Sequence, residues 1–366
     1  MRKLALVNFI ESFFSASLAV ALPLYLLSRG INVEAVGLIL SVSPLIFTLL
    51  RIVAALFAEV LGTRIFFIAT SISESVSAFT FSIASSVPLF GLGRLFEGAT
   101  YSLFWAVNRT KVIEHEQSKD TSLARLLSVR MVAATVGIGA AGVLISYSFD
   151  AFFQLLMLAG VVSLIASIFF WKGKGRAKKV EPVKMITSKK GKKFWEASCS
   201  LLFLLSAFSI LFAFLLPVYL DQELGMPYEE IGALMMLFYL CVAVGGYAAI
   251  ELGMDEKRLI FFQDIMVLMI ALIPLVPGYL APVLMMVGFG FGVSFAMQEE
   301  MVVKVSEGSE YPSTDVSILH MPAGVGEFAM LAAGGFLFAA FGSVPLFLIS
   351  AVLVAAYVHY TRNVLC

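Results

Sequence analysis

Long apolar segments follow one another along the whole chain, separated by short polar or glycine-containing turns. Crossing about 30 Å of hydrocarbon takes roughly 20 residues of helix, and the segments have about that length. Eleven or thirteen membrane-spanning helices are alternatives, because some of the turns are very short, at Gly62-Thr63, Ser85-Ser86 and Gly342-Ser343. The pattern favours twelve membrane-spanning helices, at residues 4–27, 36–60, 64–85, 87–108, 122–147, 151–171, 197–220, 231–251, 258–276, 279–303, 316–341 and 343–361.

The second half of this pattern repeats the first. Residues 22–26, Leu-Pro-Leu-Tyr-Leu, return as Leu-Pro-Val-Tyr-Leu at 216–220, an offset of 194 residues. Gly98 returns at the same offset as Gly292, so the correspondence runs over several segments. Two like-oriented halves of a membrane protein commonly meet around a substrate path near the bilayer midplane. We therefore expect an all-α integral membrane protein of two six-helix bundles, residues 1–171 and 197–366, joined by a linker at 172–196.

The overall composition supports a membrane protein and narrows the function classes. Hydrophobic residues make up 60% of the chain and charged residues 14%, with a mean hydropathy of +0.96, which does not suit a water-facing globule. The three cysteines give neither a disulfide framework nor metal-ligand spacing, so we expect no cofactor and no bound metal. The three histidines lie at different depths and form no enzyme-like constellation, and no repeated filter segment indicates a channel.

Basic residues are distributed unevenly between the two ends of the predicted helices. Twenty-one of 25 Lys and Arg fall at the N-terminus, in the even-numbered loops or in the C-terminal tail. Positive residues stay on the cytoplasmic side in short loops, so both termini are predicted to be cytoplasmic. The linker holds ten of them, which indicates a solvated connection with some attraction to anionic lipid. No aromatic interleaving or folded module accompanies these charges, so we expect no nucleic-acid partner.

Two local motifs resemble those of the major facilitator superfamily. Residues 55–64, Ala-Leu-Phe-Ala-Glu-Val-Leu-Gly-Thr-Arg, resemble the family's motif between its second and third helices, with Glu59, Gly62 and Arg64 at the acidic, turn and basic positions. Residues 94–98, Arg-Leu-Phe-Glu-Gly, resemble an Arg-x-x-Gln-Gly motif of the fourth helix, with an acid in place of the amide. The resemblance implies the two-bundle fold of that family and a secondary transporter that works by alternating access.

The first of these motifs is a candidate gate. Its short turn needs a residue free of Cβ strain, which Gly62 provides. An acidic group beside a helix end can pair with a cation of a neighbouring helix in one conformation only, so Glu59 and Arg64 are expected to bias the carrier toward one face. The alternative is that both are ordinary interfacial charges.

Seven charged side chains fall deep inside the predicted helices, where each costs about 2.5–3.5 kcal/mol on insertion scales. They are Glu11, Arg51, Glu74, Arg94, Glu97, Arg130 and Glu327. Such groups must face one another or water, and Arg51 and Arg130 are candidates for internal ion pairs. For Glu74 we favour a packing role, because the third helix of the family is peripheral and residues 71–77 are rich in serine.

One face of the fourth predicted helix indicates a cavity wall. The residues that share this face at helical spacing are Arg94, Gly98, Tyr101, Trp105 and Asn108, with Glu97 beside them. The resemblance implies that the first and fourth helices of each half line the central path, which includes a polar stripe at Asn8, Glu11 and Ser15. The candidate substrate-cavity residues are Asn8, Glu11, Arg94, Glu97, Tyr101, Trp105 and Tyr239. The alternative is a helix contact in which Arg94 and Glu97 only satisfy each other.

Glu327 is the candidate proton-coupling residue. It lies about midway along the eleventh predicted helix, and His320, about two turns away, is the ionisable residue near it in the sequence. A low-dielectric setting disfavours the charged form of a carboxylate, which suits reversible protonation. The alternative is a permanently protonated or water-satisfied Glu327 with a structural role.

These observations predict a proton-coupled antiporter that exports lipophilic or amphipathic molecules. The 33 Phe and 16 Met suit an adaptable apolar cavity. The fifth helix keeps small residues of the family's exporter motif at Ala133, Gly137 and Gly142 but lacks its proline. The expected partners are a small-molecule substrate, protons and the lipid of the cell membrane, with the protein as a monomer. Uptake of a small polar or anionic solute is one alternative, and a non-transporting substrate sensor on a carrier scaffold is another.

Overall fold

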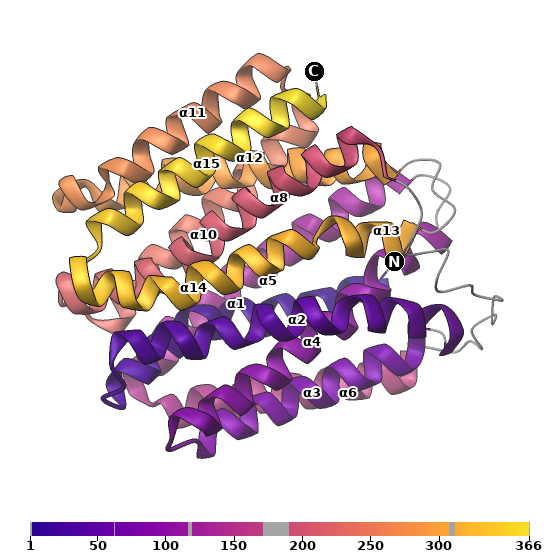
Figure 1. The fold of residues 1–366 in the computed structure, drawn as a ribbon. Helices are drawn as coiled ribbons and strands as arrows, with labels where there is room; N and C mark the ends of the chain where they lie inside the picture. The colour runs from indigo at the N-terminus through magenta and orange to yellow at the C-terminus, as the bar shows by residue number, and fades with distance from the viewer. Residues whose placement is uncertain (1, 62, 116–118, 171–189, 307–311, 366) are drawn as a thin grey trace.

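The computed structural model describes residues 2–61, 63–115, 119–170, 190–306 and 312–365, and the regular elements in these ranges are all helical (Figure 1). The first six helices are α1 (Arg2–Ser28), α2 (Val33–Leu61), α3 (Thr63–Ile83), α4 (Val87–His115), α5 (Lys119–Tyr147) and α6 (Phe149–Phe170). Helix α4 continues well past its predicted end at residue 108. The predicted end was placed where the apolar residues stop, because only the part of a helix inside the lipid must be apolar. A helix that continues beyond the lipid is therefore predicted too short.

The second half begins with α8 (Lys192–Ile210), which continues without a break through η1 (Leu211–Leu215), α9 (Leu216–Val218) and η2 (Tyr219–Glu223). The remaining elements are α10 (Tyr228–Glu251), α11 (Glu256–Leu272), η3 (Ile273–Leu275), η4 (Pro277–Tyr279), α12 (Leu280–Ser306), α13 (Pro312–Leu319), α14 (Met321–Phe341) and α15 (Val344–Leu365). The π-helical turns η1 and η2 flank Pro217, which lacks a backbone donor. The eleventh predicted helix is divided into α13 and α14 at His320, just before Pro322.

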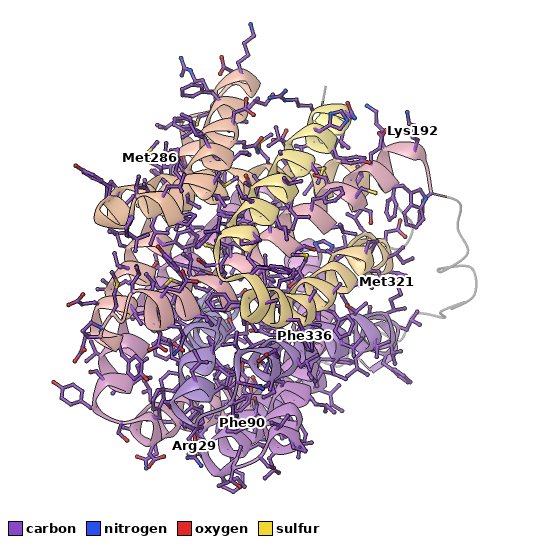
Figure 2. All side chains as sticks on the ribbon, turned by 60° about the vertical axis from the view of Figure 1, so that its left-hand side comes forward. Arg29, Phe90, Lys192, Met286, Met321 and Phe336 are labelled. Carbon is purple, nitrogen blue, oxygen red and sulfur yellow. The ribbon has the colours of Figure 1, made fainter. Side chains whose placement is uncertain are left out.

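Eleven helical segments of the described ranges are long and apolar enough to cross a membrane. Their outward faces carry large exposed apolar side chains, such as Met286 at 40% and Phe336 at 52% exposure, which suit contact with lipid (Figure 2). Helix α4 is not among the eleven, although its 29 residues are enough to span, because it carries Arg94, Glu97 and more charges toward its C-terminal end. The membrane crossing of α4 and the cytoplasmic location of the termini stay predictions.

The sequence repeat is visible in the packing of equivalent aromatic residues. The ring of Tyr25 in α1 lies 4.9 Å from that of Phe153 in α6. At the same offset of 194 residues, Tyr219 lies 5.3 Å from Phe347 in α15. The first and last helices of each half therefore meet through the same pair of positions.

Helices α1–α6 pack into one bundle and α8–α15 into a second, and the bundles meet along α2 with α14 and α5 with α10 (Figure 1). The repeat makes α2 equivalent to α10, so the two contacts are related by exchange of the halves. Both crossings need glycine. A Cβ added to Gly37 would lie 2.7 Å from the carbonyl oxygen of Leu331, and one added to Gly142 would lie 2.5 Å from the Cα of Gly232.

The apolar core joins the two bundles at one end and is divided at the other. Leu22 of α1 and Leu216 of α9 are fully buried members of one cluster that draws on both bundles. Toward the ends that precede and follow the linker, the described residues form separate clusters, one around Phe67 in the first bundle and one around Phe194 in the second. We call the joined end the sealed end and the opposite one the linker end.

Candidate functional site

A cavity of about 330 Å³ lies between the two bundles, on the linker side of the sealed end. Its walls come from α1, α2, α4 and α5 on one side and from α8, α10, α12 and α14 on the other. The lining extends from Leu40 in α2 to Glu299 in α12 and His320 before α14. Membrane carriers built from two related halves hold their substrates at such a position.

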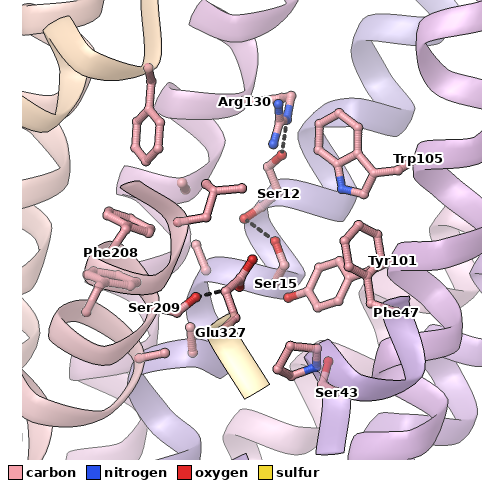
Figure 3. Close-up of a pocket in the computed structure, with 18 of the residues that line it drawn as sticks. Ser12, Ser15, Ser43, Phe47, Tyr101, Trp105, Arg130, Phe208, Ser209 and Glu327 are labelled. Carbon is pink, nitrogen blue, oxygen red and sulfur yellow. Dashed lines mark hydrogen bonds between the residues drawn. The ribbon is translucent and has the colours of Figure 1, made fainter. Parts of the chain in front are cut away.

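The first bundle contributes an aromatic wall with two guanidinium groups. Tyr101 and Phe47 meet edge to face at 6.5 Å, and Trp105 continues the wall one turn along α4 (Figure 3). The guanidinium of Arg130 lies 4.2 Å from the centre of the Trp105 ring, and that of Arg51 lies 4.9 Å from Phe47. These contacts hold two predicted ion-pair candidates against rings, an arrangement worth about 0.5–2 kcal/mol each.

The second bundle contributes a wall of aromatic rings. Phe208 of α8 and Phe212 of η1 are stacked at 5.3 Å, and Tyr239 of α10 lies 4.6 Å from Phe212. Phe295 of α12 meets Phe208 at 5.0 Å. All four line the cavity, which is therefore enclosed by aromatic groups on both sides.

Arg94 and Glu97 line the cavity as a bonded pair. Arg94 Nη1 donates to Glu97 Oε2 at 2.5 Å, and Arg94 Nη2 donates to the backbone oxygen of Leu40 at 2.6 Å. Both side chains are buried, so the pair fixes α4 against α2 while one face remains in the cavity lining. Arg94 and Glu97 therefore satisfy each other and also form part of the cavity lining, and a role in binding substrate stays a prediction.

Glu327 of α14 faces the cavity and is held by a neighbour far away in the sequence. Ser209 of α8 donates to Glu327 Oε2 at 2.6 Å (Figure 3). Arg51 lies within electrostatic range of this carboxylate. His320 lines the same cavity, and its Nδ1 lies 2.8 Å from the backbone oxygen of Val316.

A hydroxyl group links a buried acid to the cavity. Arg130 Nε donates to Ser12 Oγ at 3.3 Å, and Ser12 Oγ donates to Glu11 Oε2 at 3.1 Å. Ser12 lines the cavity, whereas Glu11, at 3% exposure, lies behind it. Glu11 therefore reaches the cavity through a neighbouring side chain.

Other predicted residues serve helix contacts. Asn8 and Asn108 donate to each other at 2.8 and 3.0 Å, are both buried, and lie outside the lining. A Cβ on Gly98 would lie 2.5 Å from the backbone oxygen of Ser43, so this glycine packs α4 on α2. Gly288, which the sequence analysis did not single out, packs α12 on α10 in the same way, because a Cβ there would lie 2.3 Å from the backbone oxygen of Phe238.

The gate motif is described only in part. Gly62 and the side chain of Glu59 lie outside the described residues. Arg64 is exposed and donates to the backbone oxygen of Ile168 at 3.1 Å, which joins the start of α3 to the end of α6. A gating role for this motif stays a prediction.

The lining contains residues that sequence reasoning missed, and the repeat is the signal that finds several of them. Ser15 was part of the predicted polar stripe, and its equivalent at an offset of 194 residues is Ser209, the partner of Glu327. The same offset relates Tyr101 to Phe295, and both line the cavity. Ser43 and Phe47 of α2 carry no such signal, because their place in the wall depends on how α2 is rotated in the bundle.

Two repeated helical bundles around a central cavity define an integral membrane protein of the solute-carrier kind. The chain belongs to the Major Facilitator Superfamily, because the profile of that family matches residues 4–310. It is a multi-pass membrane protein and a transporter of this family, not an enzyme. The family resemblance of the sequence motifs is thus confirmed.

The fold is similar to that of a solved transporter. The crystal structure of a mutant of the nucleoside transporter NupG matches with a TM-score of 0.75 and 13% identity, covering 100% of this chain and 99% of that chain. At this identity the likeness shows the fold alone. A comparison with curated proteins gives no match.

Proposed function

We propose that the chain is a proton-coupled secondary transporter that exports small lipophilic or amphipathic molecules with an aromatic body. The observation that carries the proposal is the pair of aromatic walls, Tyr101 and Trp105 facing Phe208 and Tyr239, around a cavity that also holds a carboxylate. Stacking or edge contacts with such rings contribute about 0.5–1.5 kcal/mol each beyond the buried area. A planar apolar body fits these walls.

Glu327 is the proposed coupling residue. Its carboxylate lies in the cavity lining, where it accepts a hydrogen bond from Ser209 and where Arg51 lines the same cavity. A carboxylate at this place can gain and lose a proton in each cycle. A substrate that enters the same cavity changes the surroundings of the carboxylate, which is the requirement for coupling. His320, in the same lining, is the proposed second proton carrier.

The position of the cavity supports loading from the linker end. The sealed end separates the cavity from the opposite side, and the basic residues of the linker predict that the linker end is cytoplasmic. In the proposed cycle, a compound enters from the cytoplasm, the sealed end opens as the linker end closes, and a proton replaces the compound on Glu327.

Flux measurements with reconstituted protein test this proposal. Proteoliposomes of known orientation are loaded with fluorescent planar lipophilic cations, and a pH gradient is imposed in either direction. We expect the compound to move against its own concentration gradient when protons move down their gradient in the opposite direction. This movement should stop when an ionophore collapses the proton gradient. Equal rates with and without the gradient would contradict proton coupling.

Uptake of a small polar or anionic solute is the second candidate. It is favoured by the polar part of the lining, where Ser12, Ser15, Ser43 and Arg130 face the aromatic groups. The fold likeness to a nucleoside transporter makes nucleosides a direct choice of test solute. Accumulation of labelled nucleosides, with no movement of the lipophilic cations, would select this candidate. Binding of either class without flux would select a substrate sensor.

A further inference from the structure

The charged side chains of the cavity lining are divided between the two bundles. The three arginines of the described lining, Arg51, Arg94 and Arg130, all come from the first bundle. The acids on the second-bundle side are Glu299 of α12 and Glu327 of α14. Guanidinium groups therefore line one side of the cavity, and carboxylate groups line the other.

The positive charge of the first-bundle side exceeds the charge of its own acids. Arg94 is bonded to Glu97, so this pair contributes no net charge. Glu11 lies behind the lining and is bonded to Ser12. The three arginines and these two glutamates together leave one positive charge. The second-bundle side has two glutamates, and even a charged His320 leaves it negative, so the two sides differ in the sign of their charge.

Arg130 is placed to bind an anionic group. Its Nε donates to Ser12 at 3.3 Å, and its guanidinium lies 4.2 Å from the centre of the Trp105 ring, so the side chain is held in position by two contacts. A guanidinium has five N–H donors in a planar fork that matches a carboxylate, so it can bind one in addition to these partners. A side chain that is already held in place loses less entropy on binding.

The opposite side presents hydrogen-bond acceptors. Glu327 accepts one hydrogen bond, from Ser209, through Oε2, and a carboxylate has about four sites for donors. Gln298 of α12 lines the same cavity at 6% exposure, and its Oε1 has no hydrogen-bond partner among the described residues. An ammonium group has three N–H donors and no acceptor, so it suits this side of the cavity.

We propose that the compounds carried in this cavity are zwitterions in which an aromatic body separates an anionic group from an ammonium group. The anionic group binds Arg130, and the ammonium group binds Glu327. The aromatic body lies between Trp105 and Phe208, which are on opposite sides of the cavity (Figure 3). The inference rests on the function proposed above, in which compound and proton alternate on Glu327, and it adds a second charge of opposite sign to the compound.

Binding of four naphthalene derivatives to the purified full-length protein in lipid nanodiscs tests the proposal without transport. The first is an aminomethyl-naphthoic acid with its two groups on opposite rings, which is a zwitterion at neutral pH. Its methyl ester is a cation, its N-acetyl derivative is an anion, and the N-acetyl methyl ester is neutral. Because each charged group gains a charge-assisted hydrogen bond, we expect the zwitterion to bind at least about tenfold more tightly than the other three.

Variants assign each charge of the compound to its partner. Arg130→Gln should remove the preference for the zwitterion over its methyl ester and leave binding of the ester unchanged, which also shows that the variant is folded. Glu327→Gln should remove the preference for the zwitterion over its N-acetyl derivative and leave binding of that derivative unchanged. Arg258→Gln removes an exposed arginine of α11 outside the lining, and this matched control should bind all four compounds like the wild type.

Three results would overturn the proposal. They are equal affinities of the wild type for the zwitterion and its methyl ester, tighter binding of the N-acetyl derivative than of the zwitterion, and a preference for the zwitterion that survives in Arg130→Gln. The proposed export is judged separately, by the flux of lipophilic cations. Coupled flux of these cations together with equal affinities for the four compounds would leave the export function in place and remove only the zwitterion.

Discussion

Several buried polar side chains of this protein form hydrogen bonds between helices. Asn8 and Asn108 join α1 to α4 by two reciprocal hydrogen bonds, although they are 100 residues apart. Ser209 joins α8 to Glu327 of α14 in the same way. Where such a group is buried, a lost hydrogen bond is not replaced by solvent.

Replacement of Asn108 by Ala tests this dependence. The variant leaves the buried amide of Asn8 without one of its partners, so we expect the free energy of unfolding to fall by about 1–3 kcal/mol. Denaturant titration in mixed micelles measures it, with Asn363→Ala, an exposed position on α15, as the control. The double variant Asn8→Ala/Asn108→Ala should lose less than the sum of the single variants, and simple additivity would contradict a direct interaction.

Replacement of Glu327 by Gln tests proton coupling. The amide resembles the protonated carboxyl in shape and hydrogen bonding, so we expect substrate binding and exchange between equal pools to survive. Accumulation driven by a pH gradient should be lost, because the amide releases no proton. Proteoliposome flux of Glu327→Gln is compared with that of Glu11→Gln and Glu97→Gln, whose acids lie near Arg130 and Arg94. Coupling equal to wild type in Glu327→Gln would remove this residue from the mechanism.

The sequence indicated several charged residues of the cavity lining but not the residues that bond to them. Charge at membrane depth identified Glu327 and Arg94, and both line the cavity. It did not identify Ser209 or Leu40, which bond to them, because these contacts depend on how separate helices are rotated and offset.

At the scale of elements, the apolar segments of the sequence predicted where the helices lie. Irregular turns and breaks within the helices were not predicted. Eleven segments of the described ranges have the predicted spanning character, because length and apolarity are properties of a single helix. The π-helical turns beside Pro217 and the break at His320 were not predicted, since the surrounding bundle decides whether a proline bends, widens or ends a helix. Close glycine crossings, such as Gly142 on Gly232, depend on both helices and appear only in the fold.

Replacement of Gly142 by Ala tests the contact that holds the sealed end. The added Cβ would lie 2.5 Å from the Cα of Gly232, so α5 and α10 must separate there. We expect a cysteine at the cavity position Ala213 to be labelled from the sealed end about tenfold faster, which corresponds to about 1.4 kcal/mol. Gly91→Ala is the matched control, because its Cβ would meet no atom within 4 Å. Equal labelling in the two variants would contradict a structural role for this crossing in closure.

At the scale of the whole molecule, the repeat relates two bundles but does not fix how they are inclined. Equivalent glycines, Gly37 and Gly232, lie in both contacts between the halves, so the interface is nearly symmetric under their exchange. The cavity nevertheless lies on one side of the sealed end. A carrier that works by alternating access adopts conformations open to either side with the same sequence. Which of these conformations the structure has could therefore not be predicted from the sequence.

The orientation of the molecule in the membrane is the last prediction, and it depends on the uneven distribution of Lys and Arg. In a background with Cys199, Cys241 and Cys366 replaced by Ser, a cysteine at Gly173 in the linker should react with a membrane-impermeant thiol reagent only from the cytoplasmic side. A cysteine at Gln222, in η2 at the sealed end, should react only from outside. Permeabilised cells provide the control, because both positions should then react. Labelling of both positions from one side of intact cells would contradict the two-bundle topology. Reversed labelling would place the linker outside, and the cavity would then load from the external face.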